Sequence, residues 1–239
     1  MKSRNPKATK ITADELMKQL EQDPEYIARM QEKEKQREAA IKEDLEALKP
    51  ILAELEASGY VVDSLSNLTQ SAAYRGAVPI LLKWIPSITN RNVKESVVRA
   101  LSVPWAKPTA AGPLIAEFRN MPETENLGLK WTIGNALAVV ATDETFDEIV
   151  ELVRDKRHGR AREMLAMGLG KMKNPRAADV LVELLDDEDV AGHAIMGLGK
   201  LKAQKARPHI QRFINHPKSW IRKEAKRALA KLDKKSPAL

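Results

Sequence analysis

The run from Gly192 to Lys200 is the segment most suggestive of chemistry, because its glycines and lysine resemble a phosphate-binding loop. Such a loop needs a Ser or Thr after the lysine to bind magnesium, and Leu201 stands there instead. The same pattern, Gly168 to Lys171, also occurs 29 residues earlier. We therefore interpret the glycines as part of a structural repeat, in which small residues let neighbouring helices approach.

Other clusters of reactive side chains also lack the spacing of a site. The acidic run 186–189 lacks the spaced oxygen ligands and central glycine of a calcium loop. The four histidines, His158, His193, His209 and His216, show no HExxH spacing. The chain has no cysteine, which excludes disulfides, thiolate zinc sites and cysteine nucleophiles. We predict no catalytic residue, no metal site and no cofactor.

The composition points to helices packed through aliphatic side chains. Hydrophobic residues make up 43% of the chain but aromatic residues only 4%, and a β-rich chain is usually richer in aromatic and β-branched residues. No apolar run approaches the roughly 20 residues that cross a bilayer, and no apolar core of a signal peptide follows the N-terminus. We expect a soluble cytoplasmic protein without a membrane partner.

Five copies of one pattern occupy the last two thirds of the chain. Each copy ends in an apolar stripe with steps of four, which is the period of an amphipathic helix. The stripe begins at Val93, Leu129, Ala161, Val190 and Ile221, and it ends at Leu101, Leu137, Leu169, Leu198 and Leu229. Each of these second helices follows a first helix with an apolar face of its own. Two columns of that face, three residues apart, hold one residue from each copy. The earlier column comprises Leu81, Ile115, Ile149, Leu181 and Ile210, and the later one comprises Trp84, Phe118, Leu152, Leu184 and Phe213.

A single helix pair cannot bury its apolar face alone, so the copies must stack. We predict an all-α fold, a right-handed α-solenoid of about five helix pairs over residues 75–233 with an N-terminal helical extension. These columns resemble those of HEAT-repeat proteins, most closely the short-repeat variety named after phycobilisome lyases. The resemblance implies a binding platform and, more remotely, lyase-like help in tetrapyrrole attachment.

Residues 1–74 do not fit the repeat. Thr12 to Glu15 predicts a capping box, and Asp23-Pro24 predicts the start of a helix that ends near Lys49. We assign 1–49 to a partly projecting helical arm, which is polar on every side between Gln31 and Glu38. Residues 50–74 are assigned to N-terminal cap helices and 234–239 to a disordered tail.

A basic side chain follows the first apolar residue of the second helix in four copies, and only Ala191 interrupts the series. We call this set the basic ladder; it comprises Lys94, Lys130, Arg162 and Arg222. Two interpretations stay open. The HEAT resemblance implies pairing with turn acids, for which Glu123, Asp155 and Asp186 are available. Alternatively, the ladder binds a phosphate backbone, as in helical-repeat alkylpurine DNA glycosylases.

Two further features suggest binding. Trp131 stands in a column that is otherwise not apolar, so it is either partly buried or exposed for contact with a partner. The segment 203–239 carries 11 basic and 2 acidic residues, an excess that favours an acidic partner. The basic C-terminal repeat is defined by Lys218, Lys223, Lys226, Arg227 and Lys231.

We therefore predict a non-enzymatic scaffold that holds a protein partner on its concave face, with the basic ladder and Trp131 as contacts. The alternative is a nucleic-acid-binding protein, glycosylase-like or RNA-associated, that uses the ladder and the basic C-terminal repeat.

Overall fold

The computed structural model describes residues 11–70, 74–121 and 128–233, so the predicted tail 234–239 lies outside the described residues. Within those ranges the chain forms helices, short 3-10 segments and loops, without a strand. The chain divides into two compact units, Met1–Ala47 and Leu48–Leu239. None of the described helices is long and apolar enough to span a membrane.

The first unit starts with two capped helices. In α1 (Ala13–Leu20) the Thr12 hydroxyl accepts a hydrogen bond from the Glu15 amide, and the Glu15 carboxylate accepts one from the Thr12 amide. This confirms the predicted capping box. The second helix, α2 (Pro24–Ala57), begins where a carboxylate oxygen of Asp23 accepts from the amides of Glu25 and Tyr26. Not one described residue of 11–47 is buried.

The predicted end of this helix near Lys49 is wrong, because α2 continues through Pro50 to Ala57. Proline inside a helix removes one hydrogen bond and costs about 3 kcal/mol. Pro50 is exposed, so its ring does not enter the core. Just beyond, Ile51 and Leu55 are fully buried, and this burial offsets the cost.

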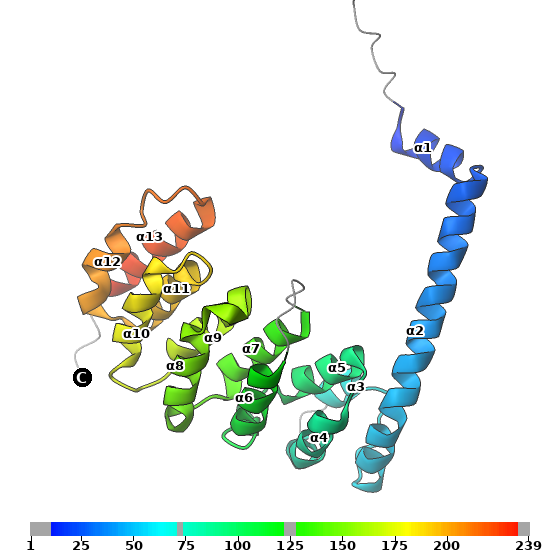
Figure 1. The fold of residues 1–239 in the computed structure, drawn as a ribbon, viewed down its shortest axis with the longest axis horizontal. Helices are drawn as coiled ribbons and strands as arrows, with labels where there is room; N and C mark the ends of the chain where they lie inside the picture. Colours follow the sequence, from blue (N-terminus) through cyan, green and yellow to red (C-terminus); the bar gives the residue numbers. More distant parts are fainter. Residues whose placement is uncertain (1–10, 71–73, 122–127, 234–239) are drawn as a thin grey trace, which may run out of the picture. The chain divides into compact units, whose positions relative to one another are not determined.

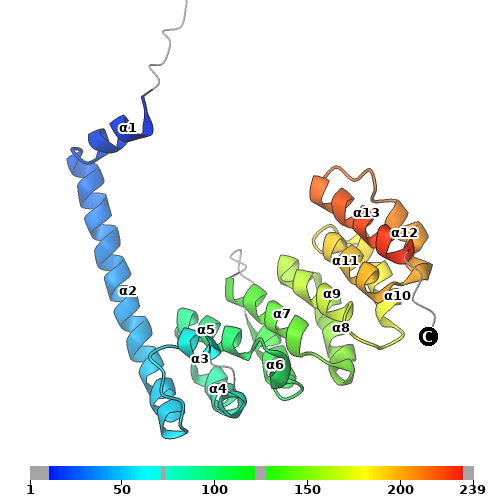
Figure 2. The ribbon, with the colours of Figure 1, turned by 180° about the vertical axis from the view of Figure 1, so that it is seen from behind.

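The second unit is a stack of five helix pairs, as predicted (Figures 1 and 2). The end of α2 and the short helix α3 (Leu65–Gln70) precede the stack along the chain. Figures 1 and 2 show the second helices along the inner side of this curved unit. The pairs are α4 (Val78–Trp84) with α5 (Arg91–Leu101), α6 (Ala111–Asn120) with α7 (Gly128–Val140), α8 (Phe146–Arg154) with α9 (Glu163–Leu169), α10 (Ala177–Glu183) with α11 (Ala191–Leu201), and α12 (Arg207–Gln211) with α13 (Ser219–Asp233).

Short 3-10 helices extend several of these elements. The longest, η5 (Lys156–Arg162), joins α8 to α9 and contains a left-handed glycine, Gly159, with φ of 49°. The others are η1 (Arg75–Ala77), η2 (Ile85–Ser87), η3 (Pro104–Ala106), η4 (Asp143–Thr145), η6 (Leu184–Asp186) and η7 (Gln204–Ala206).

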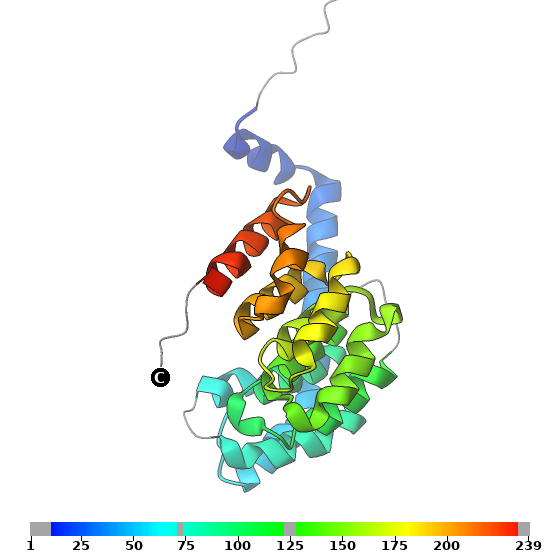
Figure 3. The ribbon, with the colours of Figure 1, turned by 90° about the vertical axis from the view of Figure 1, so that its left-hand side faces the viewer.

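The core follows the predicted apolar columns. Every named residue that begins or ends the stripe of a second helix is buried, as are the five first-helix residues that start with Leu81. The next column is less uniform, because Trp84 and Phe213 are only half-buried. Figure 3, a view turned by a quarter, shows the helix pairs of this unit behind one another.

Glycines set the distance between consecutive second helices. A Cβ atom at Gly170 of α9 would lie 2.4 Å from the Cα atom of Gly197 in α11, and one at Gly199 would lie 2.9 Å from the Cα atom of Ala228 in α13. The backbones therefore touch at these points. This explains the Gly-Leu-Gly-Lys signature as a packing motif.

We predict that Gly170→Ala destabilises the protein by about 1–3 kcal/mol, because the added methyl group must push two backbones apart. The measurement is the free energy of unfolding in urea. The control is Ala230→Leu, which adds bulk at the corresponding, exposed position of the last helix and should change stability by less than about 0.5 kcal/mol. Equal effects of the two substitutions would contradict the packing role.

Candidate functional site

The basic ladder lies at the first turn of the second helices, and the protein itself takes up its side chains. The ammonium group of Lys94 pairs with Glu117 of the neighbouring first helix α6 at 2.9 Å. Lys130 is 6% exposed, and its ammonium group donates to the Met121 carbonyl at 2.9 Å. It also lies 5.4 Å from the centre of the Phe118 ring. Neither cation is presented freely to a ligand.

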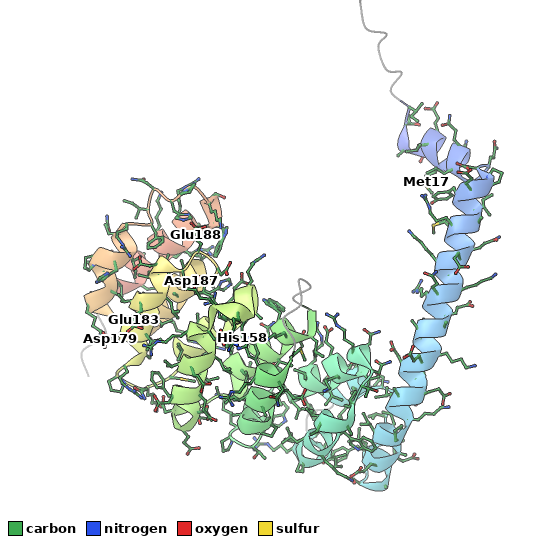
Figure 4. The ribbon with its side chains drawn as sticks, viewed as in Figure 1. Met17, His158, Asp179, Glu183, Asp187 and Glu188 are labelled. Carbon is green, nitrogen blue, oxygen red and sulfur yellow. The ribbon has the colours of Figure 1, made fainter. Side chains whose placement is uncertain are left out.

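Arg162 is the central member of the ladder and is fully buried. Its guanidinium donates to the carbonyls of Gly159 and Val153, at 2.9 and 3.1 Å. It also pairs at 2.7 Å with Asp187, which Figure 4 labels in the turn before α11, and more distantly with Asp189. One side chain thus joins the turn of the third helix pair to the turn of the fourth.

Arg222 completes the pattern, since its guanidinium donates to the carbonyls of His216 and Pro217 at 2.7 and 2.8 Å. The last carbonyls of a helix lack partners within that helix. Lys130, Arg162 and Arg222 supply donors to the segment after the first helix of their own pair. These bonds favour the interpretation in which the ladder is bonded within the protein over the one in which it contacts phosphate.

Of the three acids that we expected to pair with the ladder, the two that the structure describes have other partners. Asp155 pairs with Arg157, Asp186 pairs with Arg212, and Glu123 lies outside the described residues. The acid that receives Arg162 is Asp187, next to the predicted one. Sequence position alone does not tell which carboxylate of an acidic run turns inward.

The accessible part of the inner face contains a groove beside Trp131, with a volume of about 370 Å³. It crosses three repeats, and its lining residues come from α5, α7, η5 and α9. They are Glu95, Arg99, Gly128, Trp131, Thr132, Arg160 and Glu163. Trp131 is half-buried, so part of its side chain stays accessible in the groove.

Both carboxylates in the groove are already paired. Glu95 accepts from Arg99 at 2.5 Å and from the Thr132 hydroxyl at 3.3 Å. Glu163 is 6% exposed and accepts from Arg160 at 2.7 Å. The groove therefore combines an aromatic side chain and oriented polar groups with balanced charge. The alignment of the repeats singled out Trp131 as a candidate contact. It did not single out Arg99 or Arg160, which reach the groove from neighbouring repeats.

The basic C-terminal repeat is exposed on α13 and the turn before it. Lys218, Lys223, Lys226 and Lys231 are exposed, whereas Arg227 is paired with Glu224 at 2.5 Å. The lysines of the basic C-terminal repeat are therefore accessible, whereas the side chains of the basic ladder are bonded within the protein. Arg222 lies in the last repeat but is bonded like the rest of the ladder.

Trp220, at the start of α13, covers the glycine that opened the phosphate-loop pattern. A Cβ atom at Gly192 would lie 1.9 Å from the Trp220 ring, and that ring lies 5.6 Å from the imidazole of His193. Desolvation lowers the pKa of His193.

In the part of the chain that the structure describes, no three His, Asp or Glu side chains are grouped as metal ligands.

We predict that Arg162→Met costs about 3–5 kcal/mol, because it leaves a buried carboxylate and two carbonyls without their donor. Arg154→Gln is the matched control: Arg154 pairs with Glu183 at 2.6 Å, but both side chains are about half exposed. Exposed pairs contribute less than about 1 kcal/mol. Urea unfolding of the two variants measures the difference, and comparable losses would refute the clamping role of Arg162.

The Arg162 pair also predicts how stability depends on pH. Burial alone would raise the pKa of Asp187, but the hydrogen bond and charge of Arg162 outweigh this effect and lower it. A folded-state pKa below the unfolded value of about 3.9 stabilises the protein above that pH, and the contribution is lost as the pH falls through the folded pKa. In the Asp187→Asn variant the free energy of unfolding should fall less steeply below about pH 4 than in the unmodified protein. Urea midpoints measured over a pH series give this comparison. Parallel pH curves for the two proteins would contradict it.

Comparison with known proteins gives matches of two kinds, to a family model and to solved structures. The sequence matches the family model for HEAT repeats over residues 113–191 and 185–239, a range that begins in α6 and covers more than half of the chain. Among solved structures, the chain is similar to a designed armadillo repeat protein in complex with the peptide (KR)4. That likeness has 19% identity and a TM-score of 0.48, and it covers 78% of this chain and 99% of the designed one. No curated protein matches the sequence.

Proposed function

The chain belongs to the HEAT-repeat family, and on this premise we propose that it is a non-enzymatic scaffold that holds a protein partner on its second helices. Stacked helix pairs present an extended concave surface to a partner. Because the repeat signature recurs about every 29 to 36 residues, the proposal includes membership of the short-repeat variety of the family.

The groove beside Trp131 carries this proposal. A half-buried tryptophan next to paired acids and arginines offers apolar area together with hydrogen-bonding groups that are already in place. Tryptophan and arginine are enriched among the residues that dominate protein–protein affinity. The paired carboxylates Glu95 and Glu163 would oppose a phosphate backbone, whereas they suit a mixed polar and apolar protein surface.

We propose the arm as a second contact with the partner. Four apolar side chains of α2 are between 38% and 52% exposed; they are Ile27, Met30, Ile41 and Leu45. Exposed apolar side chains at helical spacing on an otherwise polar helix are suited to packing against another protein. In α1, Met17, which Figure 4 labels, and Leu16 are also exposed.

A photocrosslinking experiment tests the groove. Trp131 is replaced by the photoreactive residue p-benzoylphenylalanine in the full chain, in cells that normally produce the protein. We expect a crosslinked polypeptide that survives nuclease treatment and is absent when the probe stands at Glu148, an exposed position on the first helix α8. Equal products from the two positions, or a product that nuclease removes, would reject the groove as a protein site.

The same experiment tests the arm. A chain that lacks residues 1–38 should keep its melting temperature nearly unchanged, because none of the described residues 11–38 is buried. We expect this deletion to lower the crosslinking yield from position 131. An unchanged yield would show that the arm does not contribute to the partner interaction.

A further inference from the structure

A second series of basic residues recurs at the other end of the second helices. We call Lys171, Lys200 and Lys231 the lysine row. The three residues are 29 and 31 positions apart, near the C-terminal ends of α9, α11 and α13, and all are exposed. The basic ladder, in contrast, lies at the opposite, N-terminal ends of the second helices. The row is therefore a separate feature of the repeat.

Glycine packing brings the three lysines together. The contacts of Gly170 with Gly197 and of Gly199 with Ala228 lie next to the lysines in the sequence. Helices in such close contact have axes at the short end of the usual separation of about 8–10 Å. The side chain of Lys231 also passes 3.7 Å from the Cβ position that Gly199 leaves empty. The lysines thus lie beside the close contacts between consecutive second helices.

Within the described part of the chain, no carboxylate pairs with a lysine of the row. The ammonium group of Lys171 donates to the Ala138 carbonyl at 2.6 Å, which orients it without neutralising its charge. Neighbouring acids are otherwise engaged: Asp143 accepts from the backbone amides of Lys173 and Asn174, and Asp233 pairs with Arg207.

The electrostatic surroundings of Lys171 agree with this geometry. Lys171 is exposed as a residue, but its ammonium group is partly desolvated at the Ala138 carbonyl. This desolvation lowers the pKa of Lys171, and the positive charges of Lys200 and Lys107 lower it further. The charges that act on this ammonium group are thus other lysines. A cluster of cations that repel one another gains most from an anionic ligand that bridges them.

We propose that the lysine row binds the phosphate backbone of a nucleic acid. A nucleic-acid strand carries one phosphate about every 3.4 Å along its axis, so phosphates can reach cations that stand roughly 8–10 Å apart in a line. The exposed Lys223 and Lys226 of α13 extend the positive field and would speed the approach of a polyanion. A line of cations, without a surrounding apolar face, fits a strand better than a membrane surface.

This site is independent of the groove beside Trp131, which lies nearer the start of the second helices. A failure of one proposal therefore leaves the other in place. The lysine row also differs from the basic ladder, which was our first candidate for phosphate contacts.

Fluorescence anisotropy of the full chain with labelled short duplex and single-stranded DNA and RNA, over a series of salt concentrations, tests the proposal. Each bound phosphate adds about 0.9 to the slope of log affinity against log salt for duplex DNA and about 0.7 for single strands. We expect the triple variant K171Q/K200Q/K231Q to reduce the slope by about 0.7–0.9 for each phosphate that the variant no longer binds. The charge-preserving variant K171R/K200R/K231R should retain binding.

The control K33Q/K35Q/K42Q removes the same charge from exposed positions of the arm and should leave the slope unchanged. Melting temperatures establish that each variant is folded. The double variant K200Q/K231Q keeps the bond from Lys171 to Ala138 and should still reduce the slope by the amount that about two phosphates contribute.

Three outcomes would overturn the proposal. The first is no binding of any nucleic acid by the unmodified chain at about 20 mM salt, where charge screening is weak. The second is the same slope for K171Q/K200Q/K231Q as for the unmodified chain. The third is binding to polyglutamate or to vesicles of anionic lipid that is as tight as binding to nucleic acid and equally dependent on the row, which would assign the lysines to an acidic protein or a membrane.

Discussion

In three of the five helix pairs, a cation at the start of the second helix donates hydrogen bonds to carbonyl oxygens at the end of the first helix or in the turn after it. Lys130, Arg162 and Arg222 all donate to carbonyls in this region of their own helix pair. These bonds tie the second helix of each of these pairs to the turn before it. Lys94 of the first pair instead bonds to Glu117 of the second, and Arg162 also bonds to Asp187 in the turn of the fourth pair. Cations at this position therefore hold turns and join neighbouring pairs of the solenoid.

The basic ladder and the lysine row thus serve different parts of the molecule. The ladder, near the start of the second helices, is buried or bonded within the protein, as Arg162 shows most clearly. The lysines of the row, near the ends of α9, α11 and α13, stay exposed, where positive charge also interacts favourably with the helix dipole. A net charge of +7 thus describes the accessible surface poorly, because part of it serves the interior.

Much of the fold follows from the sequence, and less of the candidate site does. Helical periodicity and the repeat identified the five pairs, and their columns are buried as predicted. The continuation of α2 past Pro50 escaped prediction, because it depends on the burial of Ile51 and Leu55 in the folded chain. Likewise, the choice of Asp187 over Asp186 as partner of Arg162, and the contact of Trp220 with Gly192, depend on how helices approach in three dimensions.

The bond from Arg162 to Asp187 has a consequence for how such a protein can change its length. The fourth pair has Ala191 where the others have a cation, and its turn is held by the arginine of the third pair. Duplication of the fourth pair alone would produce a copy whose preceding neighbour brings no arginine. The third and fourth pairs are therefore coupled, and a change in repeat number at this point would keep the arginine of every turn only if both pairs were gained or lost together.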